Sequence, residues 1–80
     1  MNKFLLTITK LDGVLFRGEV ESVTLPGSAG EMTVLAHHMP LVTLLKSGQI
    51  IVKDDNKEEK FSITSGTAEI NKKEVTILVF

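Results

Sequence analysis

The sequence predicts an all-β fold, a flattened antiparallel β-sandwich or barrel of about nine to ten short strands. Short apolar runs alternate with polar residues at period two, and clusters of Gly, Pro, Asp or Asn separate the runs. No window shows apolar residues at sustained helical spacing. The 80 residues are enough for one small core, so we expect a single domain over residues 1–80.

The first strand is predicted over Phe4–Thr9, where every second residue is apolar and forms one continuous face. Leu11-Asp12-Gly13 is expected to turn the chain, because Asp-Gly readily adopts positive φ. A short strand, Val14–Phe16, is expected to follow and to end at Arg17-Gly18.

The next run, Glu19–Leu25, changes its parity. Its apolar positions are even-numbered before Glu21-Ser22 and odd-numbered after it, which predicts a β-bulge at that point. Pro26 is expected to end the strand, because proline has no N–H to donate to a ladder.

The stretch from Pro26 to Lys46 contains two strands between three breaks. The strands are predicted over Met32–Leu35 and Leu41–Leu45, and the breaks at Pro26–Gly30, at His37-His38 with Met39-Pro40, and after Lys46. Because turns and the histidine pair dominate this stretch, we expect it to contact another molecule.

The second half of the chain repeats the alternating pattern. Asp54–Lys60 is the most polar segment, and we expect a solvated hairpin tip there and a polar hairpin at Asn71–Lys73. The remaining strands are predicted over Gln49–Lys53, Phe61–Thr64, Thr67–Ile70 and Val75–Phe80.

Composition excludes several classes of protein. The net charge of −1 provides no basic footprint for nucleic acid, and the 5% aromatic content, without Trp or Tyr, disfavours stacking of sugars or single-stranded bases. The chain has no cysteine, so disulfides and thiolate metal sites are absent. The longest apolar run is too short for a transmembrane helix, and the first residues are too polar for a signal peptide.

No catalytic residue, cofactor site or metal site is predicted. The chain lacks a GxxxxGK[ST] loop, and the GxxG spacing of Gly27 and Gly30 is commoner in turns than at phosphates. His37 and His38 are adjacent, so in a strand their side chains would point to opposite faces and could not easily share one ion. Carboxylates and serines have no catalytic context, which predicts a protein that is not an enzyme.

The motifs of the whole chain together resemble the epsilon subunit of F-type ATP synthase. Phe16–Glu31 is similar to the family's F-x-G-x-V strand and its G-S-x-G-E turn, and His38–Thr43 is similar to G-H-x-P-L-[LV]-[TS]. Further similarities lie at Lys46-Ser47-Gly48, at Ser65-Gly66 and at Val75–Leu78. Two departures are His37, where the family often has Gly and where we expect a stiffer turn, and Thr67, which suggests that no positive φ is needed there.

The resemblance implies a non-catalytic rotor subunit at the foot of the central stalk, formed by the family's N-terminal β-sandwich. It would couple the gamma subunit to the membrane c-ring, on the cytoplasmic face of a bacterial inner membrane or an equivalent energy-transducing membrane. It would be a peripheral part of that complex and a monomer when isolated. The residues that match gamma-facing positions are Lys10, His38 and Thr43. The residues that match the ring-facing turn are Ser28, Ala29, Gly30 and Glu31.

Members of the family usually continue into a C-terminal extension of two helices, which can restrain ATP hydrolysis and in some members holds an ATP-binding motif. No such extension is found in these residues, so neither role is assigned to them. The alternative is a lipoyl or biotinyl carrier, or another small β-sandwich interaction module. The carrier reading needs a lysine beside Met or Asp-Ala at a hairpin tip, whereas Lys57 lies between Asn56 and Glu58.

Overall fold

The computed structural model describes residues 2–80, and these residues form nine β-strands and no helix, which confirms the predicted all-β class. Accordingly, no helix in this range is long and apolar enough to cross a membrane. The strands are β1 (Phe4–Lys10), β2 (Gly13–Val20), β3 (Ser22–Gly27), β4 (Gly30–Leu35), β5 (Leu41–Leu45), β6 (Gly48–Asp54), β7 (Lys57–Ile63), β8 (Gly66–Ile70) and β9 (Glu74–Val79).

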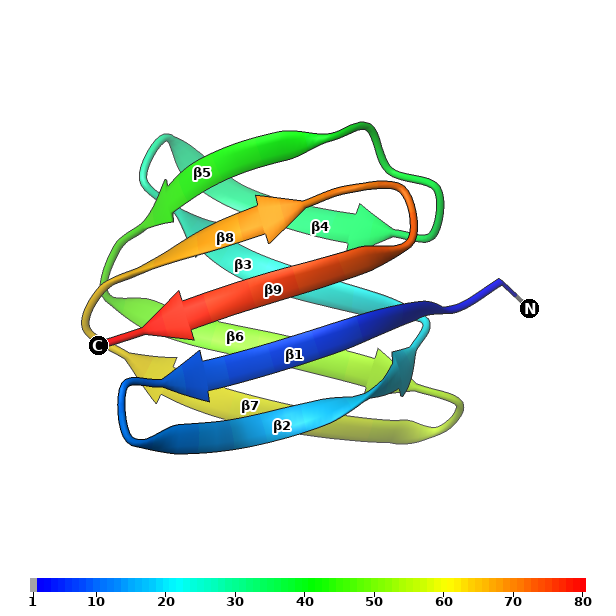
Figure 1. Cartoon of the computed structure of the whole chain (residues 1–80), viewed down its shortest axis with the longest axis horizontal. Helices are drawn as coiled ribbons and strands as arrows, with labels where there is room; N and C mark the ends of the chain where they lie inside the picture. Colours follow the sequence, from blue (N-terminus) through cyan, green and yellow to red (C-terminus); the bar gives the residue numbers. More distant parts are fainter. Residues whose placement is uncertain (1) are drawn as a thin grey trace.

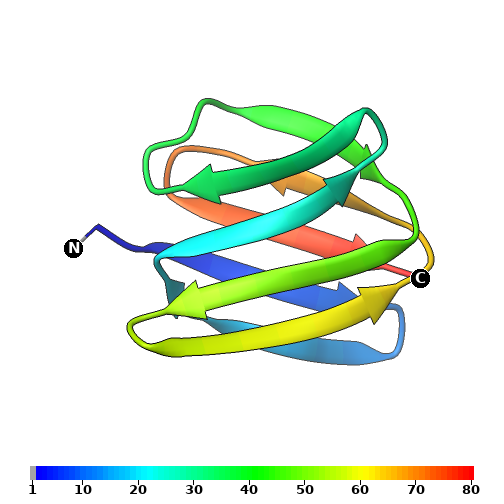
Figure 2. The same cartoon turned by 180° about the vertical axis from the view of Figure 1, so that it is seen from behind.

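The strands form one curled sheet in the order β2-β1-β9-β8-β5-β3-β6-β7, with β4 paired to β3 outside this path. Curling places β2, β1, β9, β8 and β5 in a front layer and β4, β3, β6 and β7 in a back layer (Figures 1 and 2). The expected antiparallel pairing holds except between β1 and β9, which run parallel. The first and last strands can pair in this way because most of the chain lies between them and no tight turn has to connect them.

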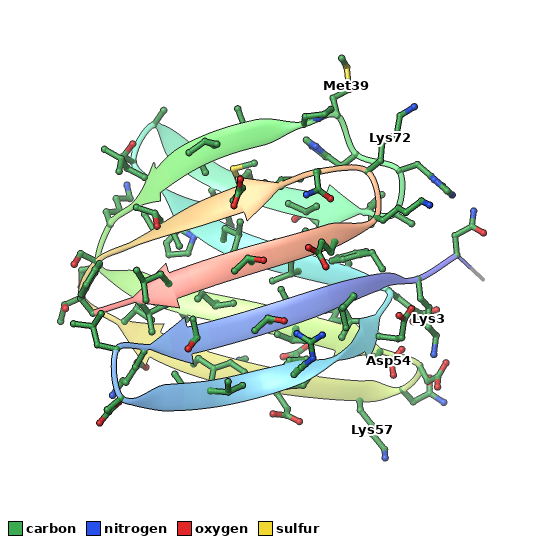
Figure 3. All side chains as sticks on the ribbon, viewed as in Figure 1. Lys3, Met39, Asp54, Lys57 and Lys72 are labelled. Carbon is green, nitrogen blue, oxygen red and sulfur yellow. The ribbon has the colours of Figure 1, made fainter. Side chains whose placement is uncertain are left out.

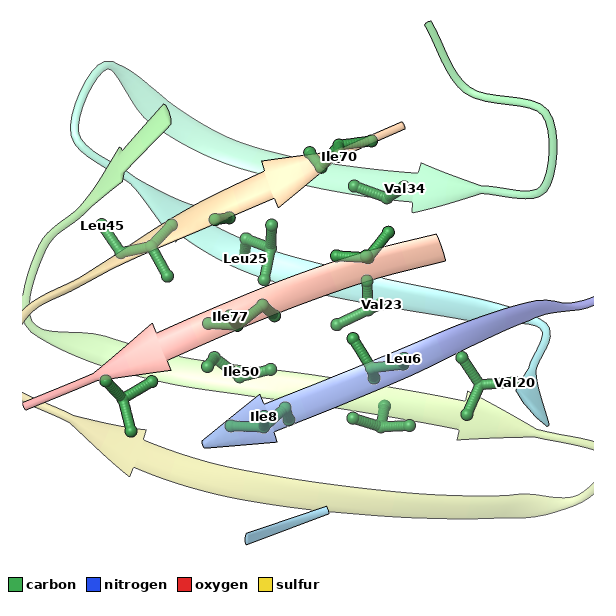
Figure 4. Close-up of a cluster of buried hydrophobic side chains, with 14 of the residues drawn as sticks. Leu6, Ile8, Val20, Val23, Leu25, Val34, Leu45, Ile50, Ile70 and Ile77 are labelled. Carbon is green, nitrogen blue, oxygen red and sulfur yellow. The ribbon is translucent and has the colours of Figure 1, made fainter. Parts of the chain in front are cut away.

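The core lies between the two layers and contains only apolar side chains among the described residues (Figure 4). Alternate residues of both layers point inward, so every strand contributes between one and three members. Each fully buried large side chain contributes about 1.5–3 kcal/mol of transfer free energy. The largest are Leu6, Ile8, Leu25, Ile50, Ile70 and Ile77.

The chain passes from the front layer to the back layer at Glu21. The parity change predicted a bulge here, but the structure has a bend that separates β2 from β3. Like a bulge, the bend changes which parity of the chain faces the core, since Val20 before it and Val23 after it are both buried. The register shift of this region lies elsewhere, where Ile8 faces Phe16 and Thr9 faces Val14, so that Leu15 is the extra residue.

Three predicted boundaries are wrong. β2 continues through Arg17-Gly18, because Gly18 pairs with Leu6 inside the ladder. β3 continues through Pro26, which pairs with Glu31 and whose carbonyl accepts a bond from Lys46, so that the missing N–H does not end the strand. The polar tip is also shorter than Asp54–Lys60, because the charged residues from Lys57 onward form edge strand β7.

Candidate functional site

The turn between β3 and β4 consists of Ser28 and Ala29, with a glycine on each side. Gly27 and Gly30 form the last pair of the ladder. A Cβ at Gly27 would lie 2.7 Å from the Gly30 carbonyl oxygen, and Gly30 has a φ of +143°. Side chains are excluded at the first position by the close approach and disfavoured at the second by the backbone conformation. The glycines that the sequence singled out are therefore required by the shape of this turn.

Two backbone hydrogen bonds attach this turn to β5. The Ser28 N–H donates to the Leu44 carbonyl at 2.9 Å, and the Lys46 N–H donates to the Pro26 carbonyl at 2.9 Å. Since β5 also pairs with β8 along its whole length, the turn is fixed to the front layer as well as to its own hairpin. The predicted ring-facing residues thus form one exposed, firmly held segment: Ser28, Ala29, Gly30 and Glu31.

An exposed apolar surface, here named the β5 ridge, is formed by Met39, Val42 and Leu44. Their exposed fractions are 77%, 70% and 62%. Leu41 and Leu45 pair with Ile70 and Gly66 of β8, which are both buried, so the odd-numbered residues of β5 are on its inward face. The even-numbered residues Val42 and Leu44 therefore point outward. The sequence analysis did not select this surface. The signal was present, because the run Leu41–Leu45 is apolar at both parities and a sandwich buries only one of them.

The structure does not bring Lys10, His38 and Thr43 into one patch. His38 lies in the β4–β5 loop, whereas Lys10 ends β1 at the opposite end of the molecule, on the side of the Ser28-Ala29 turn (Figure 1). Thr43 is half-buried opposite Ala68, on the inward-facing side of β5. His38 is also half-buried, and its Nδ1 lies 2.8 Å from the Met39 carbonyl. In the chain, His38 directly precedes the β5 ridge and Thr43 lies between its residues Val42 and Leu44.

The two sequence departures have different outcomes. His37 has a φ of 66°, so a residue with a Cβ occupies a left-handed conformation where the resembling family often has glycine. The stiffer turn expected here stays a prediction. Thr67 lies within β8 and is not among the positive-φ residues of the described chain, which confirms that expectation.

Among residues 2–80, the acidic and histidine side chains that lie close enough to share an ion form one group, Glu21, Asp54 and Asp55. Their carboxylate oxygens lie within 4.8 Å of one another. The Lys3 ammonium lies against two of these carboxylates, at 2.8 Å from Asp54 (Figure 3) and 3.6 Å from Asp55. A lysine already provides the positive charge, so the group is an ion-pair network.

Residues 3–80 match the family described as the β-sandwich domain of the ATP synthase delta/epsilon chain. An ATP synthase epsilon chain of Sulfurimonas denitrificans is 46% identical over 80 residues, which are 99% of this chain and 62% of that protein. The epsilon chain of Campylobacter jejuni strain RM1221 is 48% identical over 67 residues, or 82% of this chain and 52% of that protein. The chain therefore spans between about half and two thirds of these relatives' length.

Two solved assemblies contain chains of the same fold. In the Euglena gracilis mitochondrial ATP synthase (OSCP/F1/c-ring), the match has a TM-score of 0.90 at 30% identity and covers 96% of this chain and 50% of that one. In the Tetrahymena thermophila mitochondrial ATP synthase (central stalk and c-ring), the TM-score is 0.83 at 13% identity, over 99% of this chain and 64% of that one. The second likeness concerns the fold alone. Strand pattern, glycine turn and family match agree: the chain belongs to the family of ATP synthase delta/epsilon chains, and residues 3–80 carry its β-sandwich domain.

Proposed function

We propose that this chain is a non-catalytic rotor subunit of an F-type ATP synthase, which links the gamma subunit to the c-ring. The β5 ridge, together with His38, would contact the gamma subunit, and the segment from Ser28 to Glu31 would approach the polar loops of the ring. Named relatives that are ATP synthase epsilon chains support this role. The related Euglena chain belongs to an assembly described by its F1 part and c-ring, which supports the choice of partners.

The observation that carries the proposal is the hydrogen bond between the two exposed surfaces. The Ser28 N–H, in the turn, donates to the carbonyl of Leu44, in the ridge, at 2.9 Å. A subunit that transmits torque needs its two contact surfaces to move as one body. Backbone hydrogen bonds between paired strands and a tightly packed core provide that rigidity.

The proposed location follows from the proposed partners. As part of the complex, the chain would lie peripherally at the cytoplasmic face of a bacterial inner membrane, or at an equivalent energy-transducing membrane. It would need neither a cofactor nor a metal ion of its own, because its contribution is mechanical. Lys10 and Thr43 remain weaker candidates for gamma contact, since Lys10 lies at the far end and Thr43 is half-buried.

Binding to the cognate gamma subunit tests the proposal. Val42→Asp places a charge on the outward face of the ridge, where it should not disturb the core, because Val42 is 70% exposed. We expect it to weaken binding by about tenfold or more, since an interface centre excludes unpaired charge. His38→Asp should weaken binding less, because that side chain is half-buried beside the ridge. Calorimetry with purified gamma subunit measures both.

Asp55→Lys is the control, because Asp55 is exposed in the β6–β7 turn, at a distance from the ridge in the fold. Its affinity for gamma should stay within about twofold of the unmodified chain, as is usual for residues outside an interface. Thermal melts establish that each variant is folded before binding is compared. Equal losses at Val42, His38 and Asp55, or no loss at Val42, would refute the proposed gamma-facing surface.

A further inference from the structure

The curled sheet has a seam between its terminal strands, β2 and β7. In the described residues these two strands lie at the ends of the pairing order and share no ladder, so side chains must close the sandwich there (Figures 1 and 2). Phe16 and Phe61 meet edge to face across the seam, with ring centroids 6.1 Å apart. Beside them lies a cavity of about 90 Å³, lined by Phe16, Val52, Asp54, Lys57 and Glu59.

One end of this seam is closed by the ion-pair network. Lys3 leads into β1 of the front layer, and Asp54 ends β6 of the back layer. Their ion pair of 2.8 Å therefore joins the two layers (Figure 3). The longer contact of Lys3 with Asp55, at 3.6 Å, extends the network to the β6–β7 turn. Asp54 also lines the seam cavity, so the ion pair lies at the cavity wall.

Glu21 holds the same turn from the crossing between the layers. Its carboxylate Oε1 accepts a hydrogen bond from the Asp55 N–H at 2.9 Å, and its own N–H donates to the Lys53 carbonyl at 3.0 Å. Asp55 has a φ of 55°, a conformation that costs an L residue about 1–2 kcal/mol and that needs such support. The other carboxylate oxygen of Glu21 is buried and accepts no hydrogen bond from the described residues.

The charges of this network do not balance within it. Three carboxylates, on Glu21, Asp54 and Asp55, converge within 4.8 Å, and the ammonium that contacts two of them is that of Lys3. Asp54 raises the pKa of Lys3 by a hydrogen bond and by its charge, partly offset by desolvation, and the Asp55 charge adds to the rise. Without Lys3 the carboxylates would repel one another. The side chains of Lys3 and Asp54 are 30% and 33% exposed, and the Asp54 oxygen that contacts Lys3 is buried, so dissolved ions screen the network in part.

We propose that Lys3, Glu21, Asp54 and Asp55 form an ionic latch, which closes one end of the seam between β2 and β7 and releases the β6–β7 turn as ionic strength rises. Opening the latch would separate the β6–β7 turn from the start of β1, because Lys3 is the cross-layer partner of the turn. The Phe16–Phe61 contact and the core would keep the remainder of the sandwich folded. The device would make access to the seam cavity depend on ionic conditions.

Amide hydrogen exchange of the 80-residue chain tests the latch, with the amides of Asp55 and Lys57 as the readout. Between about 0.01 M and about 1 M NaCl the screening length falls from about 30 Å to about 3 Å. The unmodified chain should exchange these amides about three- to fivefold faster at high salt, the range expected for a partly exposed ion pair. Lys3→Met should give fast exchange at low salt and remove most of the salt effect. Glu21→Ala should accelerate Asp55 by about tenfold, because a bond to a charged acceptor is lost.

Lys60→Met is the matched control, since Lys60 pairs with Glu58 on β7 at 3.7 Å and takes no part in the latch. It should leave the exchange of the turn and its salt dependence unchanged. In every variant the amides of the core strands should keep their protection, which separates local opening from unfolding. If a variant does not fold, the salt titration of the unmodified chain still decides. Salt-independent exchange of the turn in that chain, or an unchanged salt response in Lys3→Met, would overturn the latch.

Discussion

Two hairpin turns of the same length are held in opposite ways. Between β3 and β4 the turn is Ser28-Ala29, and between β6 and β7 it is Asp55-Asn56. The first is shaped by two glycines and attached to β5 through the Ser28 and Leu44 backbone. The second has a strained Asp55 and is attached to its neighbours through the side chains of Glu21 and Lys3.

This difference has a physical consequence for each turn. A backbone hydrogen bond between neighbouring strands joins two uncharged groups, so its strength depends little on dissolved ions. An exposed ion pair is screened by salt and contributes about 0–1 kcal/mol. The β3–β4 turn is therefore suited to a contact that must keep its shape, and the β6–β7 turn is suited to local opening. The proposed rotor contact lies at the first turn, and the proposed latch lies at the second.

The largest expected effect comes from replacing either glycine of the β3–β4 turn. Gly27→Ala places a Cβ 2.7 Å from the Gly30 carbonyl oxygen, and Gly30→Val forces a β-branched residue to a φ of +143°. Each should lower the free energy of unfolding by about 1–3 kcal/mol, measured by urea denaturation. Ala29→Ser, at the exposed tip, is the control and should change stability by less than about 0.5 kcal/mol. Unchanged stability in both glycine variants would show that the turn is adaptable rather than rigid.

A smaller effect is expected at Glu31, beside the same turn. Glu31 is exposed, so Glu31→Ala should leave folding intact and weaken assembly with the ring by about 0–1 kcal/mol. If the proposed ring partner of Glu31 is a basic loop residue, Glu31→Lys adds like-charge repulsion and should weaken assembly more, in a salt-dependent way. Subunit retention and proton-pumping coupling in reconstituted enzyme measure both. Intact retention and coupling of Glu31→Lys at low salt would mean that Glu31 makes no electrostatic contact with the ring.

The smallest expected effect is a loss of stability at alkaline pH, caused by deprotonation of Lys3 beside the β6–β7 turn. The pKa of Lys3 is raised above its ordinary value of 10.5 in the folded chain, mainly by its hydrogen bond with Asp54. The folded chain thus holds this proton more tightly than the unfolded chain. The stability due to Lys3 is fully present below the ordinary value and is lost as the pH rises through the folded pKa. Asp54 and Asp55 are the acidic groups in contact with Lys3, and Glu21 lies beside them in the same cluster.

Thermal melts from neutral to strongly alkaline pH measure this effect. The difference in Tm between the unmodified chain and Lys3→Met should be constant near neutrality and should shrink above about pH 10. Lys46→Met, on the far side of the molecule from this turn, controls for general loss of positive charge (Figure 1). A difference that persists unchanged at high pH would indicate that Lys3 acts through packing of its aliphatic stem.

Most of the strand pattern was predictable because alternation at period two is a local property. Residues such as Leu6 and Ile8 are buried where the alternation places them. The predicted strand boundaries were wrong where pairing with another strand outweighed the preference of the residue itself. Gly18 and Pro26 lie inside strands, because each is paired with a residue of a neighbouring strand. Lys57 and the charged residues after it extend as a strand because β6 provides a partner for the whole length of β7.

The candidate site was predictable only in part. The resemblance selected Ser28 to Glu31, and the structure exposes all four. It also selected Thr43, whose side chain faces inward, and did not select Val42 and Leu44, which point outward. Which parity of an apolar strand faces the core cannot be determined when both parities are apolar. The answer depends on Ala68 and Ile70 of β8, which are paired with β5 although they lie far from it in the sequence.

The sequence by itself determined the all-β class, most of the strands, the glycine turn and the family, because each depends on neighbouring residues or on motif order. Only the tertiary structure decided the parallel pairing of β1 with β9, the bond from Ser28 to Leu44, and the convergence of Lys3 with Asp54. These contacts join residues that are distant in the chain. Their geometry results from the curl of the sheet around one core, which the local alternation of side chains does not specify.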